Sequence, residues 1–112
     1  MKVPNAAEAA AWYAKWFGAK VVKQGQDTVA QIPGVNIRFA ETKEAVAGTQ
    51  GRALDHIGFE VKDLAAFCKQ LEARGVKFDV PYRDVPSVGL KAAFITDPSG
   101  TYIELTQGYD KY

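Results

Sequence analysis

Cysteine and histidine are almost absent from this chain of 112 residues, which contains one of each. A single cysteine excludes an internal disulfide framework, and there is neither a Cys-x-x-Cys pair nor a glycine-rich phosphate loop. No apolar run is long enough to predict a helix that crosses a membrane. The chain also lacks a large excess of charge of either sign, because it contains 14 basic and 13 acidic residues. This balance argues against a surface that binds nucleic acid or an anionic membrane.

Hydrophobic residues, in contrast, make up 47% of the chain, which is enough for a folded core. The length suits a single domain over residues 1–112. The first residues have no signal-peptide core, so we expect a cytoplasmic protein, although a leader that has been removed would leave the same sequence.

The first half of the sequence predicts one helix followed by three strands. Asn5, with Glu8 three residues later, is typical of a helix N-cap. Apolar residues at helical spacing predict a helix over residues 6–17, which Gly18 ends. Strands are predicted over residues 19–23, 28–32 and 35–41, and a linker or mobile loop over residues 42–52.

The second half predicts the same order of elements. Residues 54–61 alternate as a half-buried strand does, and Asp63 caps a second helix that ends at Gly75. Residues 81–86 are irregular or form an edge strand, because two prolines exclude a central place in a ladder. Further strands are predicted over residues 76–80, 90–96 and 101–107, with a turn at 97–100.

The two halves also match residue by residue. Gly34-Val-Asn-Ile-Arg-Phe-Ala aligns with Gly100-Thr-Tyr-Ile-Glu-Leu-Thr, and Val3 aligns with Val61. The repeat predicts an α+β fold of paired βαβββ modules, which form a curved, half-open, barrel-like sheet with the helices outside and a cleft inside. The modules cover residues 1–48 and 54–112, with a linker at 49–53.

The alignment predicts that the first strand of module one is truncated. The distance from Val61 back to His56, counted back from Val3, runs past Met1. The position that corresponds to His56 is therefore missing from the first module. The protein begins late, the chain was cut, or the start of the gene was misplaced.

The strand over residues 54–61 presents two different faces. One face is apolar, and the other offers an imidazole, a gap and a carboxylate, which suits the floor of a binding site. The apolar face carries Ile57, Phe59 and Val61, and the other carries His56, Gly58 and Glu60.

Three stretches resemble the vicinal oxygen chelate superfamily, which includes glyoxalase I, fosfomycin-resistance enzymes, bleomycin-binding proteins and extradiol dioxygenases. They are Leu54-Asp-His-Ile-Gly-Phe-Glu-Val-Lys-Asp-Leu, Gly75, and Phe94-Ile-Thr-Asp-Pro-Ser-Gly-Thr-Tyr-Ile-Glu-Leu. The end of the first helix, Trp16-Phe17-Gly18 preceded by Trp12-Tyr13, is similar to the same group. The resemblance covers nearly the whole chain and indicates the fold rather than the reaction.

The resemblance implies one divalent metal in the cleft. His56 matches the ligand on the opening strand of the second module, and Glu104 matches the ligand on its closing strand and could also act as a base. The opening-strand ligand of the first module would precede Met1. The closing-strand position of that module, a glutamate in glyoxalase I, is Arg38 here. The resemblance therefore implies no four-ligand glyoxalase I site, and a site of two histidines and one glutamate needs a further histidine.

An imidazole and a carboxylate suit divalent Zn, Mn, Fe, Ni or Co. Such a metal polarises two neighbouring oxygens of a substrate and stabilises the negative charge that develops. The alternative is that His56 is a satisfied histidine on a sheet and Glu104 lies at a strand edge.

Other polar residues share the predicted inner face. Arg38 is either a fixed cation that binds an anionic substrate, with a catalytic role, or the partner of an internal ion pair with Glu104 or Glu60. Substrate-binding or simple lining roles are open for Asn36, Tyr102 and Thr106.

We therefore expect a lyase, isomerase or dioxygenase that depends on a divalent metal and acts on a small oxygenated compound. The rival hypothesis is a metal-free module that sequesters a ligand, like the bleomycin-resistance proteins, and a third is a truncated, inactive form. We also expect a homodimer, because the missing opening strand leaves a sheet edge that needs cover.

Overall fold

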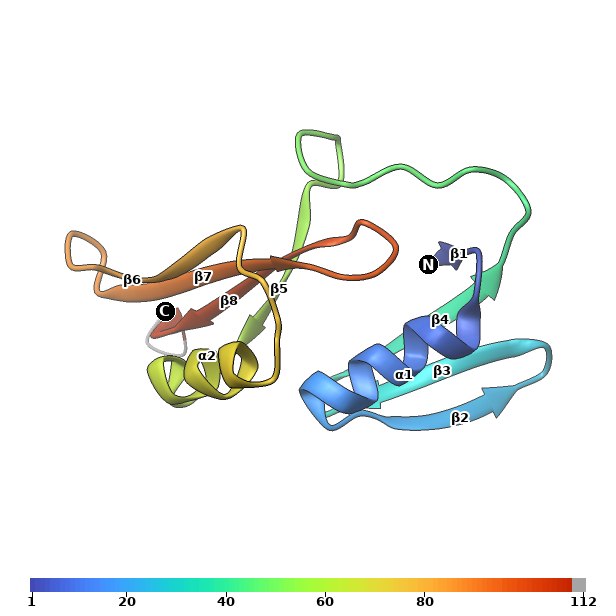
Figure 1. Cartoon of the computed structure of the whole chain (residues 1–112), viewed down its shortest axis with the longest axis horizontal. Helices are drawn as coiled ribbons and strands as arrows, with labels where there is room; N and C mark the ends of the chain where they lie inside the picture. The colour runs from blue at the N-terminus through green and yellow to red at the C-terminus, as the bar shows by residue number, and fades with distance from the viewer. Residues whose placement is uncertain (110–112) are drawn as a thin grey trace. The chain divides into compact units, whose positions relative to one another are not determined.

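The computed structural model describes residues 1–109 and forms two compact units (Figure 1). Unit 1 contains residues 1–48 and the turn at 97–100, and unit 2 contains residues 49–96 and 101–109. Each unit has an open four-stranded sheet and one helix, in the order strand, helix, three strands. The α+β class and the repeated βαβββ order are thereby confirmed. A single domain with modules at 1–48 and 54–112 stays a prediction.

Unit 1 places its strands in the spatial order β1-β4-β3-β2. The Asn5 side chain caps the helix by accepting a hydrogen bond from the Glu8 backbone N–H at 3.0 Å. Gly18 ends the helix with a φ of 66°, a left-handed conformation that glycine adopts without strain. The bounds are β1 (Lys2–Val3), α1 (Ala6–Phe17), β2 (Lys20–Gln24), β3 (Asp27–Ile32) and β4 (Val35–Glu41).

The core of unit 1 lies between α1 and the sheet. Tyr13 and Phe39 are fully buried, with their ring centroids 5.6 Å apart. Thr28 lies directly opposite Phe39 across the ladder and therefore shares its face. The apolar face of α1, predicted from its spacing, is thus the face that packs on β3 and β4.

A buried hydrogen bond joins α1 to the turn at 97–100. The Tyr13 hydroxyl donates to Asp97 Oδ2 at 2.7 Å, while Asp97 Oδ1 accepts from the Ser99 backbone N–H at 2.9 Å. Burial, reinforced by the Asp97 charge, raises the pKa of Tyr13 well above its usual value, so the hydroxyl keeps its proton. The sequence had identified Asp97 only as a turn residue.

Tyr13→Phe is expected to lower the free energy of unfolding by about 2 kcal/mol, because it removes the donor from a buried carboxylate and leaves the ring packing intact. Urea denaturation measures the change. Tyr82→Phe, at a half-buried position of unit 2, is the control and should change stability by less than about 0.5 kcal/mol. Equal stabilities for Tyr13→Phe and the unaltered chain would contradict the assignment.

Thr28 carries the one buried side-chain polar atom that lacks a hydrogen-bond partner within residues 1–109. The Thr28 side chain lies on the face of the sheet that packs against α1, and the residue is only 3% exposed. Thr28→Val is expected to raise the free energy of unfolding by about 1 kcal/mol, because the substitution removes an unsatisfied buried hydroxyl.

The control for Thr28→Val is Thr106→Val, which removes a hydroxyl that donates to Glu60 Oε2 at 2.8 Å. That substitution should destabilise the chain by about 1 kcal/mol. Thermal unfolding of the two variants should therefore show shifts of opposite sign, and a loss of stability in both would contradict the interpretation of Thr28.

Unit 2 repeats the arrangement with the spatial order β5-β8-β7-β6. Asp63 caps the helix by accepting from the Ala66 backbone N–H at 3.1 Å. The core between helix and sheet contains Leu64, Cys68, Leu71, Ala93, Ile95, Ile103 and Leu105. The bounds are β5 (His56–Glu60), α2 (Leu64–Ala73), β6 (Val80–Val85), β7 (Leu90–Thr96) and β8 (Tyr102–Gln107).

The register of the two parallel pairs confirms the internal repeat. Ala40 lies opposite Lys2 in unit 1, and Thr106, its partner in the sequence alignment, lies opposite Glu60 in unit 2. Strand β1 is two residues long, and β5 is five residues long.

The predicted strand over residues 76–80 is wrong, because the chain enters a strand only at Val80. The end of α2 uses Val76, whose N–H donates to Leu71 O, while Gly75 N–H donates to Glu72 O. This pair of bonds is the Schellman arrangement, with Gly75 at a φ of 92°.

Of the two alternatives for residues 81–86, an irregular segment or an edge strand, the structure shows the edge strand. Strand β6 lies at the edge of its sheet, and its pairing with β7 shifts register between Val80 and Arg83, where Pro81 offers no N–H. Strand β5 is shorter than the predicted 54–61, because Leu54 is 66% exposed and precedes the ladder. Within residues 1–109, no helix is both long and apolar enough to span a bilayer.

Candidate functional site

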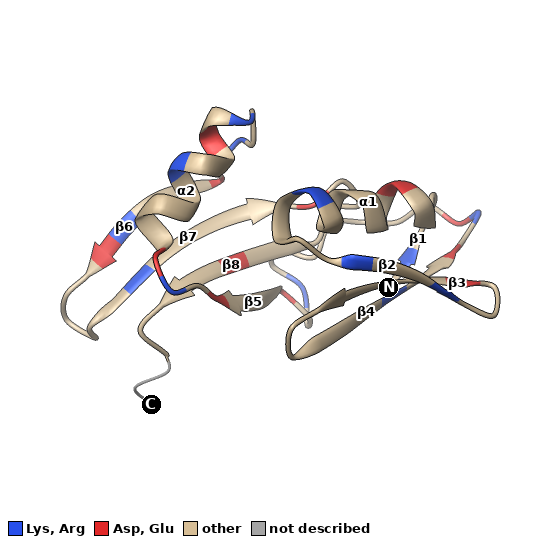
Figure 2. Ribbon diagram, turned by 90° about the horizontal axis from the view of Figure 1, so that it is seen from below, with Lys and Arg blue, Asp and Glu red and all other residues tan. Residues whose placement is uncertain are grey.

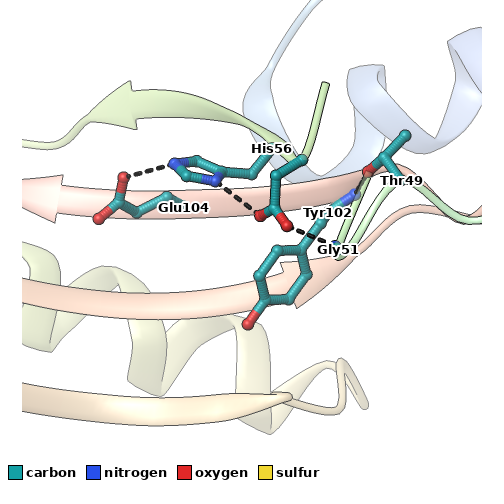
Figure 3. Close-up of polar contacts among 6 residues, drawn as sticks. Thr49, Gly51, His56, Tyr102 and Glu104 are labelled. Atoms are coloured by element: carbon teal, nitrogen blue, oxygen red, sulfur yellow. Dashed lines mark hydrogen bonds and ion pairs between the residues drawn. The ribbon is translucent and has the colours of Figure 1, made fainter. Parts of the chain in front are cut away.

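Strands β5 and β8 bring His56 and Glu104 together on the face of their sheet that points away from α2. The strands are parallel, with His56 opposite Tyr102 and Gly58 opposite Glu104. Glu104 is the only charged residue of β8, and the ribbon of β8 carries one red band in Figure 2. His56 Nε2 lies 3.3 Å from Glu104 Oε2 (Figure 3). The two side chains are 40% and 21% exposed, so a ligand could reach both.

Gly58 is the gap predicted between His56 and Glu60 on this face of β5, and it lies directly opposite Glu104 on β8. A Cβ at Gly58 would lie 3.9 Å from Glu104 Oε2, in ordinary van der Waals contact. A side chain longer than a methyl group would therefore compete with the Glu104 carboxylate for the space beside His56.

Asp55 holds the other nitrogen of the imidazole. Asp55 Oδ1 lies 2.9 Å from His56 Nδ1, and Asp55 Oδ2 accepts a hydrogen bond from the Gly51 backbone N–H. That backbone bond, followed by the bond to His56, lowers the pKa of Asp55 below its usual value. Asp55 can accept a hydrogen bond from Nδ1 and Glu104 can accept one from Nε2, because a carboxylate oxygen lies near each ring nitrogen. If an ion took the place of the proton on Nε2, Asp55 would hold the remaining proton on Nδ1.

Two aromatic rings support His56 from the neighbouring strands. Phe94 and Tyr102 stack with centroids 5.0 Å apart, and His56 meets both rings edge to face. Tyr102 N–H donates to Thr49 Oγ1 at 2.8 Å, which ties the loop before β5 to β8 (Figure 3). Burial, with the charges of Asp79 and Asp55, raises the pKa of Tyr102. The predicted substrate residue Tyr102 therefore lies beside His56 as a neutral, 7% exposed ring.

The hydroxyl of Thr106, another predicted substrate residue, is already engaged. It donates to Glu60 Oε2 at 2.8 Å, and Glu60 Oε1 accepts from the backbone N–H groups of Gly108 and Tyr109. Glu60 thus anchors the end of β8, and a substrate that used Thr106 would have to displace this bond.

Arg38 and Asn36 lie in unit 1, on the face of β4 that points away from α1. Arg38 is 62% exposed, with its guanidinium 3.6 Å from Asp27 Oδ2 and donating to Gln24 Oε1 at 2.9 Å. The ion pair of Arg38 is therefore with Asp27, a partner that the sequence had not suggested, and an exposed pair of this kind contributes little to stability.

The structure provides two donors for a divalent ion rather than a full set. Two donors that lie about 2.1 Å from one ion and about 90–110° apart are separated by about 3.0–3.4 Å. His56 Nε2 and Glu104 Oε2, 3.3 Å apart, meet this condition, and the Asp55 bond to Nδ1 supplies the orienting contact usual for a ligating histidine. Among the described residues, no group of three or more His, Cys, Asp and Glu side chains could hold an ion. The residues thus fit part of a coordination sphere.

Asp55 is the neighbour of His56 that the sequence pattern did not indicate. Neighbours along a strand point to opposite faces, so periodicity separates Asp55 from His56. The two meet because β5 begins at His56 and leaves Asp55 outside the pleat. The signal available was the Asp-His dipeptide at the start of a strand after a glycine-containing loop.

Comparison with known proteins places the chain in one family. The model of the glyoxalase/bleomycin resistance protein/dioxygenase superfamily matches residues 1–105. A lactoylglutathione lyase from Pseudomonas aeruginosa is 42% identical over 57 residues. That match spans 50% of this chain and only 30% of the relative.

Solved structures share the fold at low sequence identity. The fosfomycin resistance protein FosX from Listeria monocytogenes superposes with a TM-score of 0.79 at 18% identity, over 99% of this chain and 90% of that one. A lactoylglutathione lyase from Agrobacterium tumefaciens superposes with a TM-score of 0.70 at 19% identity, over 96% and 89% of the two chains.

Proposed function

Because the chain belongs to the glyoxalase/bleomycin resistance protein/dioxygenase superfamily, we propose that it is a lyase, isomerase or dioxygenase that uses a divalent metal and acts on a small oxygenated compound. The observation that carries this proposal is the pair of facing donors, His56 Nε2 and Glu104 Oε2, 3.3 Å apart on a sheet face. Relatives with similar sequence or structure include lyases and a fosfomycin resistance protein.

In this proposal His56 and Glu104 hold the ion, which is Zn, Mn, Fe, Ni or Co. The ion supplies Lewis acidity toward two neighbouring oxygens of the substrate. The donor set contains no thiolate within the described residues, which agrees with a borderline ion rather than a soft one.

Each residue of the cluster has a separate task. Asp55 keeps the proton on His56 Nδ1 and holds the ring in its orientation. Glu104 would help to hold the ion and would be placed to accept a substrate proton. Phe94 and Tyr102 exclude water from one side of the imidazole. Arg38 and Asn36 belong to unit 1, and a substrate-binding role for them stays a prediction from the sequence.

The test is equilibrium dialysis of the untagged chain against each of the five ions, followed by metal analysis. We expect one ion per active site, lost in Glu104→Gln and kept in Glu72→Gln, which removes an exposed carboxylate of α2. Retention of the ion by Glu104→Gln would contradict the assignment.

A second function is favoured by the small number of donors. Two protein ligands are fewer than the three or four of a tight site, so a metal-free module that sequesters a ligand is the alternative. It predicts no ion in dialysis and direct binding of an aromatic or oxygenated ligand. A homodimer, small-molecule binding and a cytoplasmic location stay predictions for this chain.

A further inference from the structure

Unit 1 contains a groove that the proposed reaction does not use. Its volume is about 420 Å³, and it lies along one flank of α1 above the edge strand β2. Neither His56 nor Glu104 belongs to it. The lining residues are Ala7, Ala11, Ala14, Val21, Val22, Lys23 and Thr28.

The groove forms where α1, which packs mainly on β3, covers β2 only in part and leaves Val21 exposed. The helix presents only methyl groups on this flank, since alanines recur at Ala7, Ala11 and Ala14. Val21 on the facing strand is 44% exposed, which is unusual for a valine of the helix-covered face. The groove is therefore apolar along most of its length and within the size range of small-molecule sites.

The polar groups of the groove lie together at one place. Lys23 and Thr28 are directly opposite each other across the antiparallel pair β2–β3, so their side chains share the face toward α1. The Thr28 hydroxyl is buried and has no hydrogen-bond partner within residues 1–109. Lys23 makes no ion pair with any described residue, and no acidic side chain lines the groove.

The Thr28 side chain lines the groove and can present its hydroxyl there without a backbone movement. Rotation about the Cα–Cβ bond exchanges the methyl and hydroxyl positions, and threonine populates more than one of these rotamers. A buried hydroxyl without a partner gains by such a rotation when an acceptor arrives.

We propose that this groove binds a small amphipathic carboxylate, with an apolar chain or ring along the alanine flank of α1. The carboxylate accepts a hydrogen bond from Thr28 Oγ1 and pairs with Lys23 Nζ. An anion is favoured because the only charged group of the lining is a cation. The carboxylate satisfies the hydroxyl that the free chain leaves unpaired.

The probe is octanoate, titrated into the ¹⁵N-labelled full chain at neutral pH and followed by amide shifts. Saturable shifts are expected in α1 and β2–β3 around the lining residues. Octanol, which lacks the charge, should bind about fivefold more weakly, and acetate, which lacks the chain, should not bind.

Matched variants separate the apolar and the polar contributions. Ala11→Leu fills the groove and should weaken octanoate about tenfold or more. Lys23→Gln should weaken octanoate about fivefold and leave octanol unchanged. Lys20→Gln makes the same charge change on the opposite face of β2 and should leave both affinities unchanged.

Thr28→Val provides a readout that a damaged fold cannot imitate. It should weaken octanoate while raising thermal stability, because the hydroxyl that it removes is unsatisfied only in the free chain. The proposal would be overturned if octanoate caused no saturable shifts in unit 1, or if Ala11→Leu bound octanoate as tightly as the unaltered chain. It would also be overturned if the shifts followed protein concentration instead, because a second copy would then occupy the groove.

Discussion

Replacing His56 by alanine is expected to lower the affinity of the chain for a divalent ion by about 100-fold or more. His56 is the only histidine of the sequence, so no other imidazole can take its place. The ring is 40% exposed and packs edge to face on Phe94 and Tyr102, so its loss should leave the fold intact. Competition against a chromophoric chelator measures the affinity, and circular dichroism checks the fold.

An unchanged affinity in His56→Ala would show that the ion binds elsewhere or through Glu104 with groups outside this cluster. An asparagine at His56 is a useful companion, because it keeps a polar side chain but offers a weaker donor. It should bind the ion nearly as poorly as the alanine variant. Activity measurements on a chosen substrate can then be interpreted on variants whose ion content is known.

Asp55→Asn is expected to reduce affinity for the ion by about 10- to 100-fold, although Asp55 is not a ligand. The carboxylate holds the proton on His56 Nδ1, whereas an amide can donate to that nitrogen and favour the wrong tautomer. The same chelator competition measures the effect. Asp63→Asn is the control, because asparagine also serves as a helix N-cap, and it should leave the affinity unchanged.

The lowered pKa of Asp55 determines how this residue makes the stability of the fold depend on pH. The Gly51 N–H and His56 lower this pKa, so the folded state binds fewer protons than the unfolded state around the ordinary carboxyl range. The stabilising contribution of Asp55 is therefore present above that range and is lost as the pH falls through the lowered value. A carboxyl ¹³C titration should place the midpoint below 3.8. A midpoint above it would contradict the hydrogen bonds to Gly51 and His56.

The sequence predicted the order of elements well, because the signals that set it are local. Asn5 and Gly18 bound α1 at the expected residues, since each provides a specific backbone or capping contact. The repeat also predicted that Glu104 would share a sheet face with His56, and register alone is enough to establish that. The ends of a helix and the face of a strand each depend on a few residues at fixed spacing along the chain.

Contacts made outside regular strands could not be predicted in the same way. Val76 fitted a strand pattern, but its N–H completes the cap of α2, which depends on the conformation of Gly75. The bond from Asp55 to His56 depends on where the ladder begins. The bond from Tyr13 to Asp97 joins residues 84 apart, and no period connects them. The partners of Arg38 likewise follow from the local turn between β2 and β3.

We propose that Nε2 of His56 binds the ion while Nδ1 keeps its proton and donates it in a hydrogen bond to Asp55. Because the chain has one histidine, ¹⁵N NMR of the imidazole during titration with Zn²⁺ reports on this ring alone. We expect the Nε2 resonance to move to a metal-bound position and Nδ1 to remain protonated. Movement of the Nδ1 resonance instead, or no change in either nitrogen at saturating Zn²⁺, would contradict it.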